Sequence, residues 1–339
     1  MKFLILGGTL FAGRAIVEAA LADGHQVTLF NRGKTNPGLF PDVNQISGDR
    51  DGDVGALSGM KFDVVVDTSA YFPRQVDGVT ETLGNIGVYV FVSSASVYAD
   101  QSVPGMAEEA EVETLEDDSV EELGEKYGAF KALCEEAVSR AVGDRALIVR
   151  SGLIVGPHDN SGRFTYWVER IAEGGQVLAP MPKDHPIQFV DVRDLADWIV
   201  GAASRGVGGT FNVASPNGAM DMQTMLEGIV AATNSDAELV WVDEEFLTDR
   251  DVEPWSDLPL WLAPQSLPTH RGFMSRDTGR AMAVGLTTRP LSDTVSATLQ
   301  WLEGEASSGA AKDFGNPSGD AGLSRDRERA LLEEWSTAR

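Results

Sequence analysis

Short apolar runs alternate with amphipathic stretches over the first 150 residues. Runs rich in Val, Ile, Leu and Phe predict buried strands at 2–6, 26–30, 43–46, 62–67, 88–93 and 146–150. Apolar residues at helical spacing predict helices between them, at 11–22, 54–58, 74–83 and 125–142. Strands that alternate with helices predict a parallel sheet covered on both faces, with right-handed crossovers. We therefore expect an α/β fold, with a doubly wound parallel sheet of the Rossmann type.

The alternation loosens after residue 150. Helices are predicted at 163–173, 192–204, 222–232 and 291–302, and a strand at 209–213, while four prolines make 254–270 an irregular loop. We expect 1–155, with about 187–215, to form the dinucleotide-binding domain. A smaller C-terminal α/β substrate domain would comprise 156–186 and 216–303. The Gly/Ser/Ala-rich stretch 304–322 predicts a flexible linker, and 323–339 a C-terminal helix with Leu331, Leu332 and Trp335 on one side.

Composition narrows the class of protein. The 339 residues are 42% hydrophobic and 23% charged, which is typical of a globular protein. The 52 acidic and 27 basic residues give a net charge of −25. This charge disfavours nucleic-acid and anionic-membrane partners, because both kinds of recognition depend on Lys and Arg. Cys134 is the only cysteine and the four histidines lack metal-ligand spacing, so we expect no disulfide, no metal site and a cytoplasmic location.

A glycine-rich loop, Gly7-Gly8-Thr9-Leu10-Phe11-Ala12-Gly13, separates the first predicted strand from the first predicted helix. A dinucleotide site needs a tight turn there, close backbone approach to the pyrophosphate and a helix N-terminus facing the charge. Leu10 stands where many such loops have a middle glycine. An ordinary glycine-rich turn is the alternative, but the position after an N-terminal strand favours cofactor binding by Gly7, Gly8, Thr9, Phe11, Ala12 and Gly13.

The end of the second strand usually selects the cofactor. An acid there binds the ribose 2′-hydroxyl of NAD, whereas a basic residue accommodates the 2′-phosphate of NADP. This chain has Asn31-Arg32-Gly33-Lys34 and no acid, with Arg14 as a third candidate cation. We therefore expect NADP(H) in preference to NAD(H), the alternative being that Arg32 and Lys34 are solvated loop charges. Asp49 and Arg50 follow the third strand, where an acid could bond the adenine amino group.

Three residues form a candidate catalytic set. Tyr127 and Lys131 are four residues apart on a predicted helix and so share a face. A nearby ammonium lowers a tyrosine pKa, which makes Tyr127 a candidate acid/base. Ser94 ends the fifth predicted strand, and ligands of open α/β sheets bind beyond the carboxyl ends of strands. The Tyr/Lys spacing is common by chance, and the strand-end serine adds weight to it.

These motifs together resemble an extended short-chain dehydrogenase/reductase of the NAD-dependent epimerase/dehydratase family. The glycine-rich loop, Asp67-Thr68-Ser69-Ala70, Ser94, the Tyr127/Lys131 pair and the stretch 189–196 fall in family order, strongly over 1–215 and loosely over 216–300. The Gly-Gly-Thr-x-Phe-x-Gly loop resembles the branch that includes bacterial reductase-like proteins and plant chloroplast stem-loop RNA-binding proteins.

The resemblance implies roles for individual residues. Tyr127 would exchange the hydroxyl proton, Lys131 would hold the nicotinamide ribose and tune Tyr127, and Ser94 would position the substrate oxygen. Residues Thr68, Ser69 and Ala70 would line the cofactor.

Two departures bear on the substrate. Where nucleotide-sugar enzymes of this family place an arginine and an asparagine, this chain has Ile187 and Leu153, so two polar anchors are missing. Arg163 could substitute for them. We expect His158, Arg163 and Tyr166 to contact substrate, with core packing as the alternative for the aromatic residue.

An acidic segment, 100–125, contains eleven acids and neither Lys nor Arg. It lies between Ser94 and Tyr127 in the chain. A solvated, mobile insertion is the simpler interpretation, and a lid that repels anionic substrates is the sharper one.

The leading hypothesis is an NADP(H)-dependent oxidoreductase or epimerase acting on a small carbonyl or hydroxyl compound. Ala95 and Ser96 follow Ser94 where dehydratases usually carry an acid, which argues against dehydration. A nucleotide-sugar epimerase and a non-catalytic nucleotide- or RNA-binding relative stay open. A homodimer through helices 74–83 and 125–142 is expected by analogy.

Overall fold

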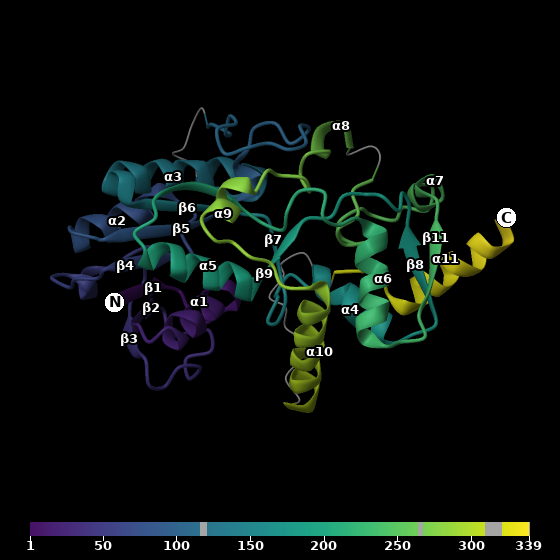
Figure 1. Ribbon diagram of the computed structural model, residues 1–339, viewed down its shortest axis with the longest axis horizontal. Coiled ribbons are helices and arrows are strands. Elements are labelled where there is room, and N and C mark those ends of the chain that lie inside the picture. Colours follow the sequence, from purple (N-terminus) through teal and green to yellow (C-terminus); the bar gives the residue numbers. More distant parts are fainter. Residues whose placement is uncertain (116–120, 264–266, 309–320, 339) are drawn as a thin grey trace.

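The computed structural model describes residues 1–115, 121–263, 267–308 and 321–338. A large sheet with helices on both sides makes up one end of the molecule, and a smaller part with short strands makes up the other (Figure 1). The N-terminus lies at the far end of the first part and the C-terminus at the far end of the second. The expected α/β architecture is confirmed.

The large sheet has seven strands in the order β10-β6-β5-β4-β1-β2-β3, and all of its pairings are parallel. Its strands are β1 (Lys2–Leu6), β2 (Gln26–Asn31), β3 (Asn44–Ser47), β4 (Val64–Asp67), β5 (Val88–Ser94), β6 (Ala146–Ser151) and β10 (Gly209–Val213). All four residues of β4 are buried, as expected for a strand covered on both faces. The strand order reverses between β1 and β4, which opens a crevice at their carboxyl ends.

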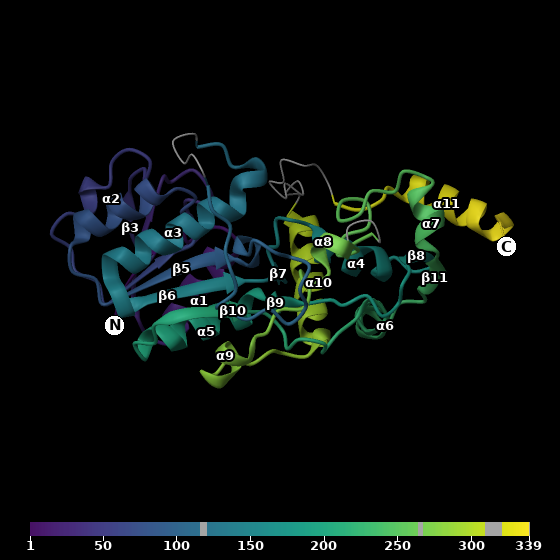
Figure 2. The ribbon, with the colours of Figure 1, turned by 90° about the horizontal axis from the view of Figure 1, so that it is seen from above.

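Helices cover both faces of this sheet. Helices α1 (Phe11–Ala22) and α5 (Val192–Ser204) lie on one face, and α2 (Pro73–Leu83) and α3 (Tyr127–Val142) on the other (Figures 1 and 2). The helix predicted at 54–58 is a single 3₁₀ turn, η1 (Gly55–Leu57). The helix predicted at 125–142 begins as another short 3₁₀ turn, η3 (Gly124–Lys126), because Gly124 adopts a positive φ of 32° before α3 starts.

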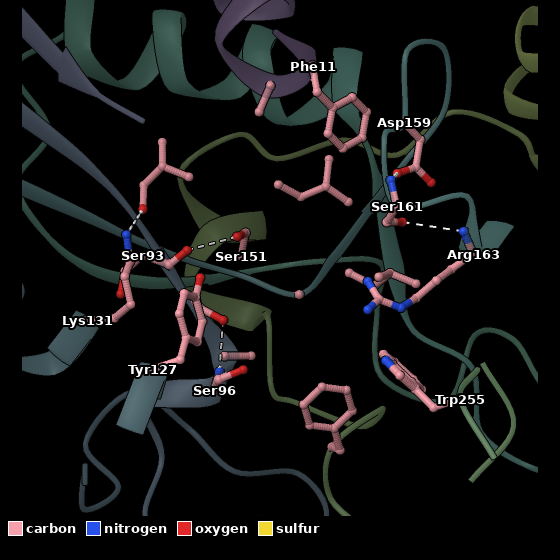
Figure 3. Close-up of a pocket in the computed structure, with 18 of the residues that line it drawn as sticks. Phe11, Ser93, Ser96, Tyr127, Lys131, Ser151, Asp159, Ser161, Arg163 and Trp255 are labelled. Carbon is pink, nitrogen blue, oxygen red and sulfur yellow. Dashed lines mark hydrogen bonds between the residues drawn. The ribbon is translucent and has the colours of Figure 1, made fainter. Parts of the chain in front are cut away.

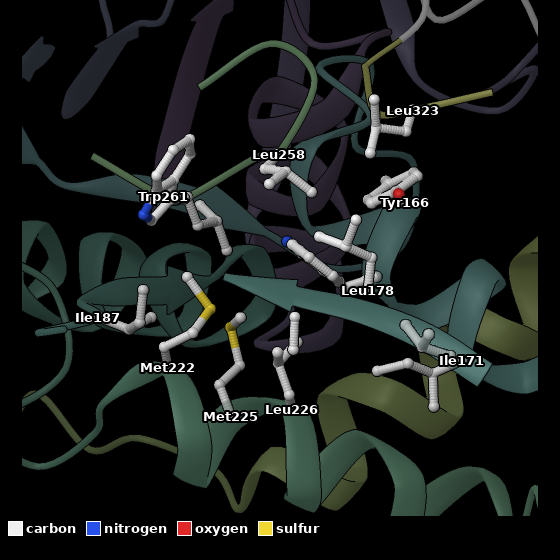
Figure 4. Close-up of a cluster of buried hydrophobic side chains, with 14 of the residues drawn as sticks. Tyr166, Ile171, Leu178, Ile187, Met222, Met225, Leu226, Leu258, Trp261 and Leu323 are labelled. Atoms are coloured by element: carbon white, nitrogen blue, oxygen red, sulfur yellow. The ribbon is translucent and has the colours of Figure 1, made fainter. Parts of the chain in front are cut away.

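The smaller part has its own apolar core (Figure 4). Two parallel two-stranded sheets pair β8 (Gln176–Pro180) with β11 (Glu238–Val242), and β7 (Leu153–Val155) with β9 (Phe189–Asp191). Its helices are α4 (Arg163–Ala172), α6 (Met222–Thr233), α7 (Glu244–Thr248), α8 (Leu267–His270) and α10 (Leu291–Ser308), with α9 (Gly279–Ala283) packed beside β10. The sequence pattern did not predict these four strands; β7 and β9 have only three residues each, whereas β8 and β11 have five, as β1 does.

One carboxylate ties the two parts together. Asp191 caps the N-terminus of α5 by accepting a hydrogen bond of 2.8 Å from the Arg193 backbone N–H. Its other oxygen accepts from the Thr294 hydroxyl of α10 at 2.7 Å. Arg193 also pairs with this carboxylate. The predicted stretch 189–196 therefore links the sheet domain to the helices of the smaller part.

The C-terminal predictions need one correction. Helix α10 continues to Ser308, so the first residues of the predicted linker 304–322 are helical; residues 309–320 lie outside the described part of the chain. Helix α11 (Arg325–Ala338) confirms the predicted terminal helix. Leu331 and Trp335 are buried against the core of the smaller part, and Glu328 forms a buried ion pair with Arg170 at 2.5 Å.

Most described acids of the acidic segment are exposed, as the solvated interpretation expects, but part of the segment packs against the protein. Val112 bridges to Tyr98, and Met106 packs in a small apolar cluster with Tyr98 and Ala132. Glu108 is 8% exposed and accepts a hydrogen bond from the Asn212 backbone N–H at 2.8 Å. Its neighbour Glu109 pairs with Arg280. The acids at 116–118 lie outside the described residues.

Among the helices that the structure describes, none has the length and hydropathy needed to cross a bilayer.

Candidate active site

The glycine-rich loop lies at the crevice between β1 and β4. Gly7 and Gly8 have φ values of +103° and +91°, which an L-side chain rarely adopts. A Cβ on Gly13 would lie 2.8 Å from the Gly8 backbone nitrogen, so only glycine allows the helix to approach the loop this closely. Backbone N–H groups at the start of α1 are thereby available to a negatively charged ligand.

A cavity of about 630 Å³ extends from this loop across the end of β2. It is lined by the residues that the sequence predicts for the cofactor, with the exception of Ala70: Gly7, Gly8, Thr9, Phe11, Ala12, Gly13, Asn31, Arg32, Lys34, Asp49, Arg50, Thr68 and Ser69. Ala70 is fully buried, and its carbonyl accepts a hydrogen bond from Lys131. The glycine cradle and these donors fit a dinucleotide.

A buried ion pair shapes the floor of this first cavity. The Arg50 guanidinium donates two hydrogen bonds, of 2.6 and 2.7 Å, to the Asp67 carboxylate, which is fully buried. Asp67 also accepts from the Tyr89 hydroxyl and from the backbone N–H groups of Ser69 and Ala70. Although burial opposes ionisation, Arg50 and these hydrogen bonds hold the pKa of Asp67 below its ordinary value. Arg50 therefore fixes the wall of the cavity, and its charge is already paired.

The cations after β2 differ from Arg50. Arg32 and Lys34 are exposed, line the cavity and form no ion pair among the described residues. Asn31 holds the turn that follows, because its side-chain oxygen accepts from the Gly33 N–H at 2.8 Å. Arg14, the third predicted cation, instead pairs with Glu18 and contacts the His158 ring at 3.3 Å.

A second cavity, of about 970 Å³, adjoins the first. The two share five lining residues: Phe11, Ala12, Thr68, Tyr71 and Asn160. Ser94, Tyr127 and Lys131 all line the second cavity, so the structure brings the predicted catalytic set together. Tyr127 and Lys131 are labelled in Figure 3. Ser94 ends β5, and the other two lie in the first turns of α3.

Burial dominates the ionisation of Tyr127. It raises the pKa of this hydroxyl to about 12, and Tyr71 adds to the rise while a hydrogen bond with Ser94 opposes it. The expectation that Lys131 lowers this pKa is not met. Tyr127 is therefore protonated at neutral pH and is set up as a proton donor.

Lys131 is committed to the backbone. Its Nζ donates to the carbonyls of Ala70 at 3.0 Å and Val92 at 2.8 Å, and lies 4.1 Å from the centre of the Phe91 ring. Burial lowers its pKa to about 8. An ammonium has three donors, so one N–H is left for a ligand in the cavity.

The opposite wall of the second cavity comes from the smaller part of the molecule. Figure 3 shows Asp159, Ser161, Arg163 and Trp255 across from Tyr127. Of the predicted substrate residues, Arg163 lines this cavity. The sequence reasoning missed Asp159, although it stands in the polar run that follows β7.

The other two predicted substrate residues lie elsewhere. Tyr166 packs in the core of the smaller part and is 7% exposed (Figure 4). Tyr166 points away from the cavity because it lies on the side of α4 that packs into this core, between α6 and α11. His158 lies between Arg14 and the Trp301 ring. Neither residue lines the second cavity.

The two positions where nucleotide-sugar enzymes place polar anchors are apolar here. Leu153 lines the second cavity, and Ile187 is buried in the core of the smaller part. Of the acids in 100–115, none lines the second cavity. Within the described chain, no group of three or more His, Cys, Asp or Glu side chains is arranged to hold a metal ion.

A family model described as the NAD dependent epimerase/dehydratase family matches residues 74–214. This match covers less than half of the chain, and over these residues the chain is similar to that family. Among curated proteins, the chloroplast stem-loop binding protein of 41 kDa b of Arabidopsis thaliana is 26% identical over 216 residues, covering 58% of this chain and 53% of that protein. The chain thus matches about half the length of this relative.

Solved structures share the fold of the chain. Bordetella bronchiseptica WbmH in complex with NAD+ is 18% identical, with a TM-score of 0.64 over 89% of this chain and 98% of that one. The UDP-glucose-4-epimerase of Stenotrophomonas maltophila, with bound NAD and formylated UDP-arabinopyranose, is also 18% identical, with a TM-score of 0.64 over 92% and 100%. At this identity the likeness concerns the fold alone.

Proposed function

We propose that this protein is an NADP(H)-dependent oxidoreductase or epimerase that acts on a small carbonyl or hydroxyl compound. The observation that carries the proposal is the meeting of two cavities, one over the glycine-rich loop and the other lined by Ser94, Tyr127 and Lys131. A ligand that extends from the first cavity would reach the second beside Tyr127.

Each residue of the catalytic set has one task. The neutral Tyr127 hydroxyl gives a proton to the substrate oxygen in the reducing direction and takes it back in the other. The Ser94 hydroxyl hydrogen-bonds the same oxygen and orients it. The remaining N–H of Lys131 holds the ribose next to the nicotinamide. A nicotinamide cofactor supplies the hydride chemistry when it is bound.

The preference for NADP(H) rests on Arg32 and Lys34. Both are exposed at the first cavity without an ion-pair partner among the described residues, and no acid ends β2. A 2′-phosphate on the ribose would meet these two cations.

A substrate smaller than a nucleotide sugar fits the second cavity better, because Leu153 and Ile187 replace two polar anchors. The name of the Arabidopsis relative suggests RNA binding as the competing function. The net charge of −25 disfavours that function, since phosphate backbones are bound by clusters of Lys and Arg.

Thermal unfolding with added ligands tests the proposal. NADPH should raise the melting temperature more than NADH does at the same concentration, because a ligand that binds only the folded state stabilises it. UDP-glucose and dTDP-glucose should have little effect. A larger shift with NADH would overturn the cofactor preference, and a shift with a stem-loop RNA alone would favour the competing function.

A further inference from the structure

Asp159 is a buried carboxyl group with one free oxygen. Its side chain is fully buried, and Oδ1 accepts a hydrogen bond of 2.8 Å from the Ser161 backbone N–H. Oδ2 has no hydrogen-bond partner among the described residues. An acceptor left unpaired in the interior costs free energy, so its presence calls for an explanation.

Arg163 lies in the same wall with its guanidinium unpaired. It lines the second cavity, is partly buried, and stacks over the Trp255 ring at 5.3 Å from the ring centre. Within the described chain, no carboxylate lies within 4.0 Å of it. Burial lowers its pKa, as expected for a cation that has lost water without gaining an anion.

The two groups attract each other across the cavity wall but do not pair. Each is held by a separate anchor, Asp159 by the turn through Ser161 and Arg163 by the Trp255 ring. Ser161 also connects them, because its Oγ accepts from the Arg163 backbone N–H at 3.4 Å. The wall therefore presents one hydrogen-bond acceptor and one cation side by side (Figure 3).

We propose that this wall is the substrate-recognition site, and that it takes a hydroxylated anion whose hydroxyl donates to Asp159 Oδ2 and whose carboxylate or phosphate pairs with Arg163. The assignment rests on the proposed function, because a further carbon of the same molecule must reach Tyr127. A hydroxyl suits Asp159 because it donates without adding a charge to the buried site.

The rest of the cavity fits such a ligand. Leu262 and Phe273 supply apolar walls for a short carbon chain, and Tyr127 with Ser94 lies across from Asp159. Glu253 also lines this cavity, and its acidic side chain disfavours anions that carry two negative charges. A polyol acid and a sugar phosphate both have the required groups, and Glu253 favours the polyol acid, which carries a single negative charge.

Matched six-carbon probes separate the two contacts. D-Gluconate carries both hydroxyls and a carboxylate, D-glucitol carries the hydroxyls alone, and hexanoate carries the carboxylate alone. Calorimetric titration into the NADP+-saturated protein should give binding at least about tenfold tighter for D-gluconate than for either of the others. D-Glucose 6-phosphate in the same titration tells whether phosphate serves as well as carboxylate.

Two variants assign the contacts. Asp159→Asn should reduce gluconate affinity to that of hexanoate, and Arg163→Met should reduce it to that of glucitol, while Asp42→Asn, an exposed acid, should change nothing. NADP+ affinity should persist in all three variants, which reports that they are folded. Equal affinities for the three probes, or variants that bind gluconate like the wild type, would overturn the assignment. If the wild-type protein did not bind NADP+, the proposed function itself would be overturned.

Discussion

Two aspartates, Asp67 and Asp159, are both fully buried and line or support the two cavities, yet they are opposites in chemistry. Asp67 pairs with Arg50 and accepts from Tyr89 and two backbone N–H groups. Asp159 has one backbone donor and a free oxygen. The pKa of Asp67 lies below its ordinary value, whereas burial raises that of Asp159 to about 6.

The difference separates the wall around Asp67, whose carboxylate is fully paired within the protein, from the wall around Asp159, where polar groups lack partners. Asp67 and Arg50 neutralise each other in the wall of the first cavity, so this part of the wall needs no ligand to balance its charges. Around Asp159 and Arg163, an acceptor and a cation lack partners in the described chain. Unpaired groups of this kind cost stability and are typical of places where a ligand supplies the missing contact.

The largest expected effect is on the turnover rate, through Tyr127, which lies across the second cavity from Asp159. Tyr127→Phe removes the proton donor but keeps the ring, so turnover should fall about 10²- to 10⁴-fold. NADPH consumption with a panel of aldehydes and ketones measures it. Tyr166→Phe is the matched control, because that ring lies in the core and should leave the rate unchanged. An equal loss in both variants would refute the role of Tyr127.

The Asp67→Asn substitution should lower the free energy of unfolding more than any substitution near Asp159 does. Removing one partner of a buried pair leaves Arg50 uncompensated, which costs about 3–5 kcal/mol of unfolding free energy. Because the folded-state pKa of Asp67 is lowered, the pair stabilises the protein above the ordinary aspartate pKa and loses its effect as the pH falls. Urea denaturation at neutral and acidic pH measures this. A variant as stable as the wild type at pH 7 would contradict the comparison.

The effect of Asp159→Asn on the free energy of unfolding should have the opposite sign to that of Asp67→Asn. Since the folded-state pKa is raised to about 6, the ionised carboxylate destabilises the fold above that pH and not below the ordinary value of 3.8. The variant should therefore gain up to about 3 kcal/mol of stability at pH 8 and nothing at acidic pH. Denaturation across this pH range tests the sign, and a loss of stability at pH 8 would show that Asp159 is a structural group like Asp67.

The smallest effect is expected at the edge of the first cavity. Arg32→Ala with Lys34→Ala should weaken NADPH binding about tenfold and leave NADH binding unchanged, because only NADPH carries the 2′-phosphate. Fluorescence titration of both dinucleotides measures it. An equal loss for both cofactors would mean that the two cations attract any anion.

Sequence reasoning predicted the lining of the first cavity and the Tyr127/Lys131 pair of the second because these signals are local. A glycine loop after a strand, a strand end without an acid, and a Tyr and Lys four residues apart each occupy one short stretch of chain. Asp159 was missed because its environment is assembled from β7, α4 and the distant residue Trp255. Its Asp-x-Ser turn in a polar run after a strand was the available signal. Tyr166 was predicted as a substrate contact, although α4 turns that position into the core.

The strands β7, β8, β9 and β11 were not predicted because burial in the smaller part depends on pairing between distant segments. The ionisation of Tyr127 also differed from expectation. Its spacing from Lys131 was correct, but the ammonium donates to the Ala70 and Val92 carbonyls, which only the folded structure reveals.

Calorimetric titration of NADPH into the wild-type protein tests whether the two cavities hold a dinucleotide next to Tyr127. One NADPH should bind per chain, and NADH should bind more weakly. Absence of binding by both dinucleotides would contradict this prediction.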